Sequence, residues 1–178
     1  MQQYINKVIS TAIIEDIGSI REGIAEFLKI QPNILCEIQA ASVEEFLHAN
    51  QPAQDIEVLL LDIGLPGMSG ISGIKFIKEM YPDINIIMLT VYEDPDKIFE
   101  ALCAGATGYL VKNTPLPKIK ESIEEVINGG APMTPHIARK VLNSFSTNVK
   151  QKKKETLTPK EKEIVAGLTD GLSYKMIA

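Results

Sequence analysis

The chain has 178 residues, 45% of them hydrophobic, which is enough for one full domain and a smaller second piece. Its net charge of −5 conceals an asymmetry: residues 1–130 carry 9 Lys and Arg against 19 Asp and Glu, whereas residues 131–178 carry 9 against 4. The two parts therefore have net charges of −10 and +5. The sequence contains no run of roughly 18 apolar residues and no signal peptide, so we expect a cytoplasmic protein without membrane contact.

Four strand-like runs end on side chains that can do chemistry. The runs and the residues that follow them are Val8–Ile14 with Glu15 and Asp16, Val58–Leu61 with Asp62, Ile84–Leu89 with Thr90, and Gly108–Val111 with Lys112. The unbroken aliphatic run Val58–Leu61 is typical of an inner strand of a parallel sheet. Because parallel strands place their carboxyl ends along one edge, we expect these side chains to converge there.

Helical patterns alternate with the strand-like runs, at residues 17–30, 43–49, 71–80, 95–104 and 115–128. This alternation predicts an α/β fold, a doubly wound five-stranded parallel sheet with the flavodoxin-like order 2-1-3-4-5. The polar and apolar alternation at Glu37-Ile38-Gln39 suits a strand at the edge of that sheet.

The residue types at the predicted edge fit a magnesium and phosphate site. Three carboxylates offer the hard oxygen ligands that Mg²⁺ takes while it keeps several waters. A hydroxyl and an ammonium group beside them can bind the oxygens of a phosphoryl group. Each residue alone has an ordinary interpretation as a turn former, a helix cap or a solvated strand end. Their joint occurrence favours the functional interpretation.

This pattern resembles the receiver domain of bacterial two-component response regulators. The matching stretches are Ile13–Asp16, Leu60–Gly70, Met88–Thr90 and Gly105–Lys112. The resemblance implies that Asp62 accepts a phosphoryl group, which would make the chain a phosphoprotein of a phosphorelay rather than an enzyme. Any phosphorylation or dephosphorylation that it catalyses on itself would be slow.

The resemblance also assigns roles around Asp62. The implied metal site for Mg²⁺ comprises Asp16, Asp62 and the carbonyl group of Gly64, with Glu15 in the outer shell. Thr90 and Lys112 would bind the phosphoryl oxygens, and Tyr109 would be the aromatic switch. Gly64 lies two residues after Asp62, and Tyr92 lies two residues after Thr90. These two residues would modulate the rate of dephosphorylation. The sequence departs from the family at Glu15, where Asp is more common, and at Asn113, where many relatives have Pro.

Beyond residue 130 the sequence changes character, and we expect three regions. Residues 6–130 form the receiver, residues 131–156 a linker with a short helix from Pro135 to about Ser144 and a basic run at Lys150–Lys154, and residues 157–178 the start of a further domain. Thr158-Pro159-Lys160-Glu161 is a capping box with proline at the first helical position. Together with residues 171–178, it resembles the opening of a LuxR-type helix-turn-helix domain. The recognition helix of that all-α domain would follow residue 178.

The two resemblances place the chain with the NarL/FixJ subfamily of response regulators. They imply a sensor histidine kinase as partner, DNA binding and transcription regulation by the full-length form only, and a phosphorylation-dependent homodimer. An alternative is a stand-alone phospho-receiver that acts as a signalling protein or a phosphate sink. A phosphohydrolase of the haloacid dehalogenase type is disfavoured, because such enzymes carry a second Asp where this chain has Gly64. A nucleotide-binding site is disfavoured too, because the sequence lacks GxGxxG and P-loop motifs.

Overall fold

The computed structural model describes residues 7–49 and 56–151, without the side chains of residue 49 and of residues 145–151. Its strands are β1 (Ile9–Ile14), β2 (Ile34–Ala40), β3 (Val58–Leu61), β4 (Asn85–Thr90) and β5 (Gly108–Val111). Its helices are α1 (Gly18–Lys29), α2 (Val43–Ala49), α3 (Gly70–Met80), α4 (Pro95–Ala104), α5 (Leu116–Ile127) and α6 (Pro135–Gln151). The first five helices lie where the sequence pattern predicts them.

The strands form one parallel sheet in the order β2-β1-β3-β4-β5, which confirms the predicted doubly wound topology. All four residues of β3 are fully buried, as expected for an inner strand with helices on both faces. In contrast, β2 alternates between buried and exposed residues at the sheet edge. The register aligns Ile14 of β1 with Leu61 of β3, so the residues that follow these two strands are neighbours at one edge.

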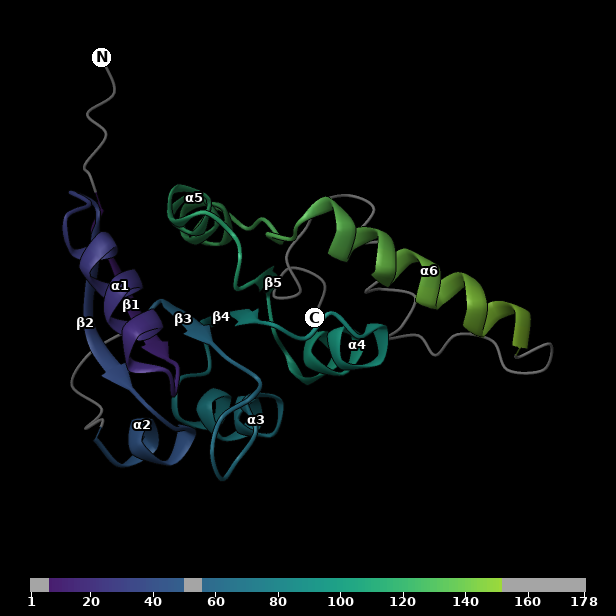
Figure 1. Cartoon of the computed structure of the whole chain (residues 1–178), viewed down its shortest axis with the longest axis horizontal. Helices are drawn as coiled ribbons and strands as arrows, with labels where there is room; N and C mark the ends of the chain where they lie inside the picture. The colour runs from purple at the N-terminus through teal and green to yellow at the C-terminus, as the bar shows by residue number, and fades with distance from the viewer. Residues whose placement is uncertain (1–6, 50–55, 152–178) are drawn as a thin grey trace, which may run out of the picture.

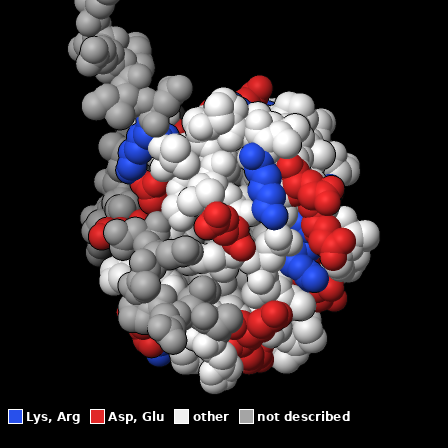
Figure 2. Space-filling view, turned by 90° about the vertical axis from the view of Figure 1, so that its left-hand side faces the viewer, with Lys and Arg blue, Asp and Glu red and all other residues white. Residues whose placement is uncertain are grey.

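Helices cover both faces of the sheet, and each face has its own apolar cluster. Side chains from α2, α3 and α4 pack on one face, and side chains from α1 and α5 pack on the other. In Figure 1, α2 and α3 lie below the sheet and α5 lies above it. Figure 2 shows acidic and basic side chains interspersed on one side of the molecule, so the negative charge does not gather in a single patch there.

Helix α6 extends the domain beyond the five-helix pattern. It packs against α4, and its residues Ile137 and Val141 are fully buried in the same cluster as α4 residues Ile98 and Leu102 (Figure 1). The prediction that this helix ends near Ser144 is wrong, since the helical backbone continues to Gln151. The segment 146–156 predicts a linker because it lacks apolar periodicity, but residues 145–151 contain no Gly or Pro that would end a helix already begun.

The segment before α6 lies beside β5. The N–H group of Tyr109 donates to the Pro132 carbonyl oxygen at 2.8 Å, and Tyr109 forms an isolated parallel bridge with Met133. A methyl group at Gly108 would lie 2.8 Å from the Pro132 ring, so only glycine allows this approach.

The predicted helix-turn-helix start at residues 157–178 lies outside the described residues. Within residues 7–49 and 56–151, no helix is long and apolar enough to cross a membrane.

Candidate phosphoacceptor and metal site

Asp62 stands at the carboxyl end of β3, at the centre of the predicted edge. Its side chain is 4% exposed, and its Oδ1 accepts a hydrogen bond of 2.7 Å from the Ile63 N–H group. The Asp62 N–H group donates to the Ile14 carbonyl oxygen at 3.1 Å, which fixes the residue to β1. A methyl group at Gly70 would overlap the Asp62 carbonyl oxygen, so the start of α3 packs directly on the backbone of this residue.

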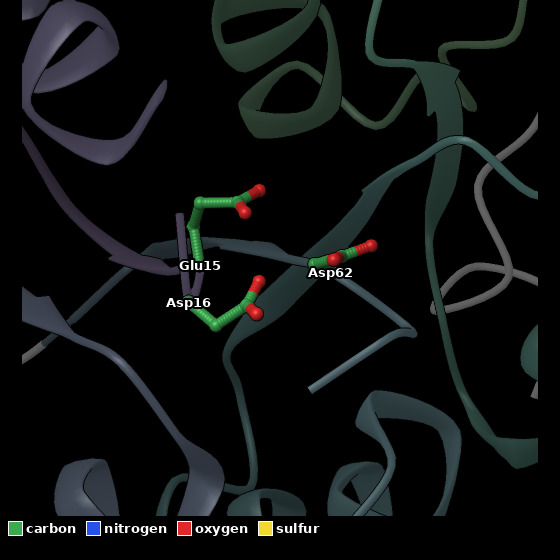
Figure 3. A group of neighbouring side chains, drawn as sticks. All are labelled: Glu15, Asp16 and Asp62. Atoms are coloured by element: carbon green, nitrogen blue, oxygen red, sulfur yellow. The ribbon is translucent and has the colours of Figure 1, made fainter. Parts of the chain in front are cut away.

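Three carboxylates gather at this edge, as the strand ends predict. Glu15, Asp16 and Asp62 each offer an oxygen atom, and these oxygens lie within 4.8 Å of one another (Figure 3). Glu15 and Asp62 are buried, whereas Asp16 is exposed. Three hard oxygen donors with one of them open to solvent fit a divalent cation that keeps part of its hydration shell.

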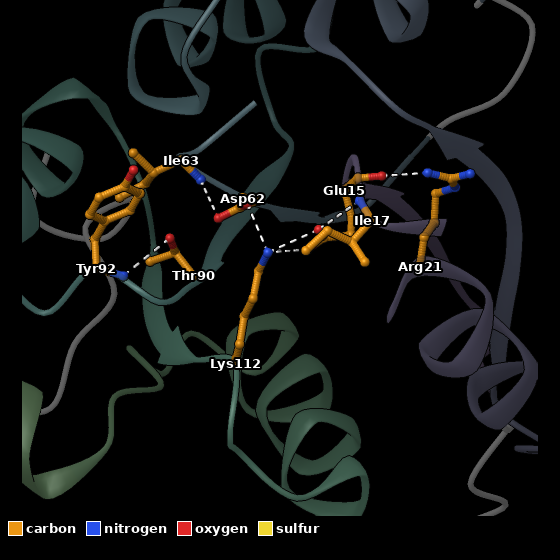
Figure 4. Close-up of polar contacts among 8 residues, drawn as sticks. All are labelled: Glu15, Ile17, Arg21, Asp62, Ile63, Thr90, Tyr92 and Lys112. Atoms are coloured by element: carbon orange, nitrogen blue, oxygen red, sulfur yellow. Dashed lines mark hydrogen bonds and ion pairs between the residues drawn. The ribbon is translucent and has the colours of Figure 1, made fainter. Parts of the chain in front are cut away.

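Lys112, which follows β5, reaches across the edge to two of these carboxylates. Its Nζ lies 2.9 Å from Asp62 Oδ2 and 2.7 Å from Glu15 Oε2 (Figure 4). The lysine side chain is only 10% exposed. Burial by itself would lower the pKa of Lys112, but the hydrogen bonds and charges of Glu15 and Asp62 outweigh it and raise that pKa. The ammonium group therefore stays charged beside Asp62.

The Glu15 carboxylate is held by hydrogen bonds from two partners. Besides Lys112, its Oε1 accepts a hydrogen bond from the Ile17 N–H group at 3.1 Å. Burial raises the pKa of Glu15, and the hydrogen bond from Lys112 offsets only part of that shift. Arg21 of α1 donates to the Glu15 backbone carbonyl oxygen at 2.6 Å. Arg21 could not be predicted as part of this site from the sequence, because its separation of six residues from Glu15 matches no local motif.

Thr90 and Tyr109 lie in the same region as Asp62. Thr90 is fully buried at the end of β4, and its Oγ1 accepts a hydrogen bond from the Tyr92 N–H group at 3.4 Å. The Tyr109 hydroxyl donates to the Tyr92 carbonyl oxygen at 2.7 Å, and burial strongly raises the pKa of this hydroxyl. Tyr109 is itself fully buried, within the cluster to which α6 contributes. The β4–α4 loop is thus attached to Tyr109 by a hydrogen bond.

Gly64 and Tyr92 lie near Asp62. In Figure 4 the Tyr92 ring is to the left of Asp62, whereas Lys112 reaches it from below. A methyl group at Gly64 would lie 3.3 Å from Cε2 of Tyr92 and 3.6 Å from Asp62 Oδ2. The aromatic ring therefore borders the space above Gly64, beside the carboxylate. The fold thus brings Glu15, Asp16, Asp62 and Lys112 together. It places Gly64, Thr90 and Tyr109 in contact with Tyr92.

Comparison with known proteins agrees with this geometry. The family model described as the response regulator receiver domain matches residues 11–124, more than half of the chain. The chain belongs to the two-component response regulators.

Curated relatives of this response regulator are transcriptional regulators. Transcriptional regulatory protein LnrK of Bacillus subtilis is 31% identical over 96% of this chain and 81% of LnrK. Transcriptional regulatory protein YdfI of the same species is 32% identical over 97% of this chain and 79% of YdfI. The chain is accordingly a response regulator of the class that controls transcription, and the stand-alone phosphate sink is not favoured.

A solved LuxR-family response regulator from Aurantimonas has the same fold as this response regulator. It superposes with a TM-score of 0.72 at 22% identity, over 79% of this chain and 99% of that one.

Proposed function

We propose that this response regulator accepts a phosphoryl group from a sensor histidine kinase on Asp62 and controls transcription in response. The single observation that carries the proposal is the position of Asp62. Its carboxylate lies at the end of an inner strand, within 2.9 Å of a buried ammonium group and beside two further acids. The ammonium group of Lys112 can pair with the negative oxygens of an incoming phosphoryl group without leaving its place.

The donor set of Glu15, Asp16 and Asp62 supports Mg²⁺ as the cofactor. Asp16 and Asp62 would hold the ion together with the Gly64 carbonyl oxygen, and Glu15 would act from the outer shell while holding Lys112. When bound, Mg²⁺ supplies positive charge that stabilises the negative charge on the transferring group. Asp62 provides the attacking carboxylate oxygen, and the kinase phosphohistidine loses its bond to phosphorus as the new bond forms.

A small phosphodonor such as phosphoramidate tests the proposal without the kinase. Incubated with donor and Mg²⁺, the parent chain should gain one phosphate that alkali and hydroxylamine release, as expected for an acyl phosphate. The Asp62→Asn variant should gain none, while an Asp83→Asn variant, which changes an exposed carboxylate outside the site, should be labelled like the parent. Labelling of Asp62→Asn on another residue would contradict the assignment.

The contacts of the β4–α4 loop support a route from Asp62 to α6. At one end of the loop, Thr90 lies beside the acceptor site. At the other end, Glu93 is held by α6, since Lys140 Nζ lies 2.7 Å from its carbonyl oxygen and 3.0 Å from its Oε2. His136 Nε2 lies 3.1 Å from the same Oε2. We propose that phosphoryl binding draws Thr90 toward Asp62 and thereby shifts the position of α6.

Tyr109 links this loop to the segment before α6, because its hydroxyl donates to the Tyr92 carbonyl oxygen while its N–H group donates to the Pro132 carbonyl oxygen. The Thr90→Ala variant should therefore accept phosphate but show a smaller change in α6. Hydrogen exchange of the α6 amides, with and without beryllofluoride as phosphoryl mimic, measures that change. An unaltered response of α6 in Thr90→Ala would show that the coupling follows another route.

We also propose a phosphorylation-dependent homodimer and, in the full-length form, DNA binding. Because α6 packs on α4, the exposed sides of α1 and α5 are the better candidates for the dimer surface. Sedimentation of the chain with and without beryllofluoride tests dimerisation. The cytoplasmic location and the helix-turn-helix domain stay predictions from the sequence.

A further inference from the structure

The Tyr92 ring is held in place beside the phosphoacceptor by contacts on several sides. Its backbone is anchored, because the Tyr92 carbonyl oxygen accepts the 2.7 Å hydrogen bond from the Tyr109 hydroxyl. Its Cε2 and Oη lie 3.3 Å and 3.6 Å from the position of a methyl group at Gly64. That same position is 3.6 Å from Asp62 Oδ2, so the phenol ring and the acceptor carboxylate border one small volume.

Lys97 holds the face of this ring. Its Nζ lies 3.6 Å from the centroid of the Tyr92 ring, within the range of a cation–π contact. Lys97 belongs to the first turn of α4, and its N–H group donates to the capping carboxylate of Asp94 at 3.3 Å. The side chain thus extends from a fixed point on α4 to the face of the ring.

We propose that Lys97 is a positioning residue that keeps the Tyr92 ring over the acceptor site and so prolongs the life of the phosphorylated state. This inference rests on the proposed phosphorylation of Asp62. Lys97 would act on the reaction at Asp62 through the Tyr92 ring. Helix α4 would thereby influence the chemistry at the sheet edge.

The reaction that the ring would slow is hydrolysis of the acyl phosphate. The oxygen of a water molecule forms a bond to phosphorus while the bond between phosphorus and the Asp62 oxygen breaks. The carboxylate leaves with the electron pair, and the protons of the water remain on the released phosphate or pass to solvent. The water must approach in line with the breaking bond, so a ring fixed in that space lowers the rate. Gly64 offers no side chain that could orient the water.

The test compares the rate of phosphate release from labelled proteins. The 178-residue chain is phosphorylated with phosphoramidate and Mg²⁺, freed of donor, and followed for loss of phosphate. Lys97→Met keeps the length of the side chain and removes its charge, and it should accelerate release about two- to fivefold, the factor equivalent to an exposed cation–π contact of about 0.5–1 kcal/mol. Lys97→Arg keeps a cation over the ring and should decay like the parent.

Two further variants separate positioning from a general effect of charge. Lys75→Met removes an exposed lysine of α3 and should leave the rate unchanged. In a Tyr92→Ala background, Lys97→Met should add nothing, because no ring remains to be held. Equal decay of Lys97→Met and the parent would overturn the inference, and so would an equal acceleration by Lys97→Met in the Tyr92→Ala background. Failure of the parent to take up phosphate would instead overturn the proposed function, and the inference with it.

Discussion

Two regions of the molecule are stabilised by different interactions. The acidic edge, formed by Glu15, Asp16 and Asp62, depends on buried ion pairs, whereas the α4–α6 face depends on apolar packing. At the edge, a buried ammonium group joins two buried carboxylates, and apolar residues only form the surroundings. At the α4–α6 face, Ile137 and Val141 are buried, whereas Glu93 is 41% exposed and pairs with residues at the surface. Buried charges have few alternative partners, while a docked helix can separate from its face as a unit. The edge is therefore the rigid end of the proposed signal route, and α6 is its adjustable end.

Removing the ammonium group from the edge should have the largest effect. Lys112→Met leaves the Glu15 and Asp62 carboxylates buried without their partner, which should lower the free energy of unfolding at neutral pH by about 3–5 kcal/mol. Mg²⁺ should restore part of the loss. Lys118→Met is the control, because the Lys118–Glu121 pair is exposed and contributes about 0–1 kcal/mol. Equal urea midpoints for the two variants would show that the edge does not depend on the buried charge.

A methyl group placed against the backbone of Asp62 should also lower the stability of the protein strongly. Gly70→Ala would push the start of α3 against the Asp62 carbonyl oxygen, which cannot move aside like a flexible side chain. We expect a loss of about 3 kcal/mol of stability and slower phosphorylation of Asp62. Gly23→Ala on α1, where a methyl group has free space, should instead stabilise by about 0.5–1 kcal/mol. A Gly70→Ala protein as stable as Gly23→Ala would contradict the packing described.

Shortening a buried side chain of α6 should loosen that helix without unfolding the sheet. Ile137→Ala removes apolar contact with the α4 cluster at a cost of about 2 kcal/mol or more. The loss should appear as faster hydrogen exchange of the α6 amides, with β4 amides unchanged. Leu142→Ala is the control, since Leu142 is 47% exposed and should have a much smaller effect. Equal acceleration in β4 would mean that α6 and the sheet unfold together.

The smallest effect should be the pH dependence of the Glu93 contacts. The hydrogen bond from Lys140 holds the pKa of Glu93 below its ordinary value near 4.5. Because the folded-state pKa is depressed, the contribution is present above about pH 4.5 and is lost as the pH falls through the folded-state value. Exchange protection of α6 should therefore decline on acidification in the parent more than in Glu93→Gln. Parallel pH profiles would exclude Glu93 as an anchor of α6.

The site could be predicted from the sequence because its residues follow strand ends. In a parallel sheet that position alone brings Asp62, Thr90 and Lys112 to one edge, and the apolar run before Asp62 identifies the inner strand. The order of the strands followed from the same alternation of elements. The direct pairing of Glu15 with Lys112 could not be foreseen, because it depends on the length and rotamer of one side chain.

The docking of α6 was harder to predict than the site. The i, i+4 spacing of Ile137 and Val141 is visible in the sequence, but it does not specify which surface the helix covers. That choice depends on contacts with α4, more than thirty residues earlier in the chain. The contact of Lys97 with the Tyr92 ring could not be predicted for a similar reason, since nothing in the local sequence around Lys97 points to that ring.

The pairing of β5 with Pro132 and Met133 has a consequence for association between molecules. An outermost strand usually presents free backbone groups that a second chain can extend by edge-to-edge pairing. Here the Tyr109 N–H group already donates to Pro132, and proline has no N–H group with which to continue a ladder. The turn before α6 thus closes this edge against added strands, which protects a short, apolar strand from aggregation.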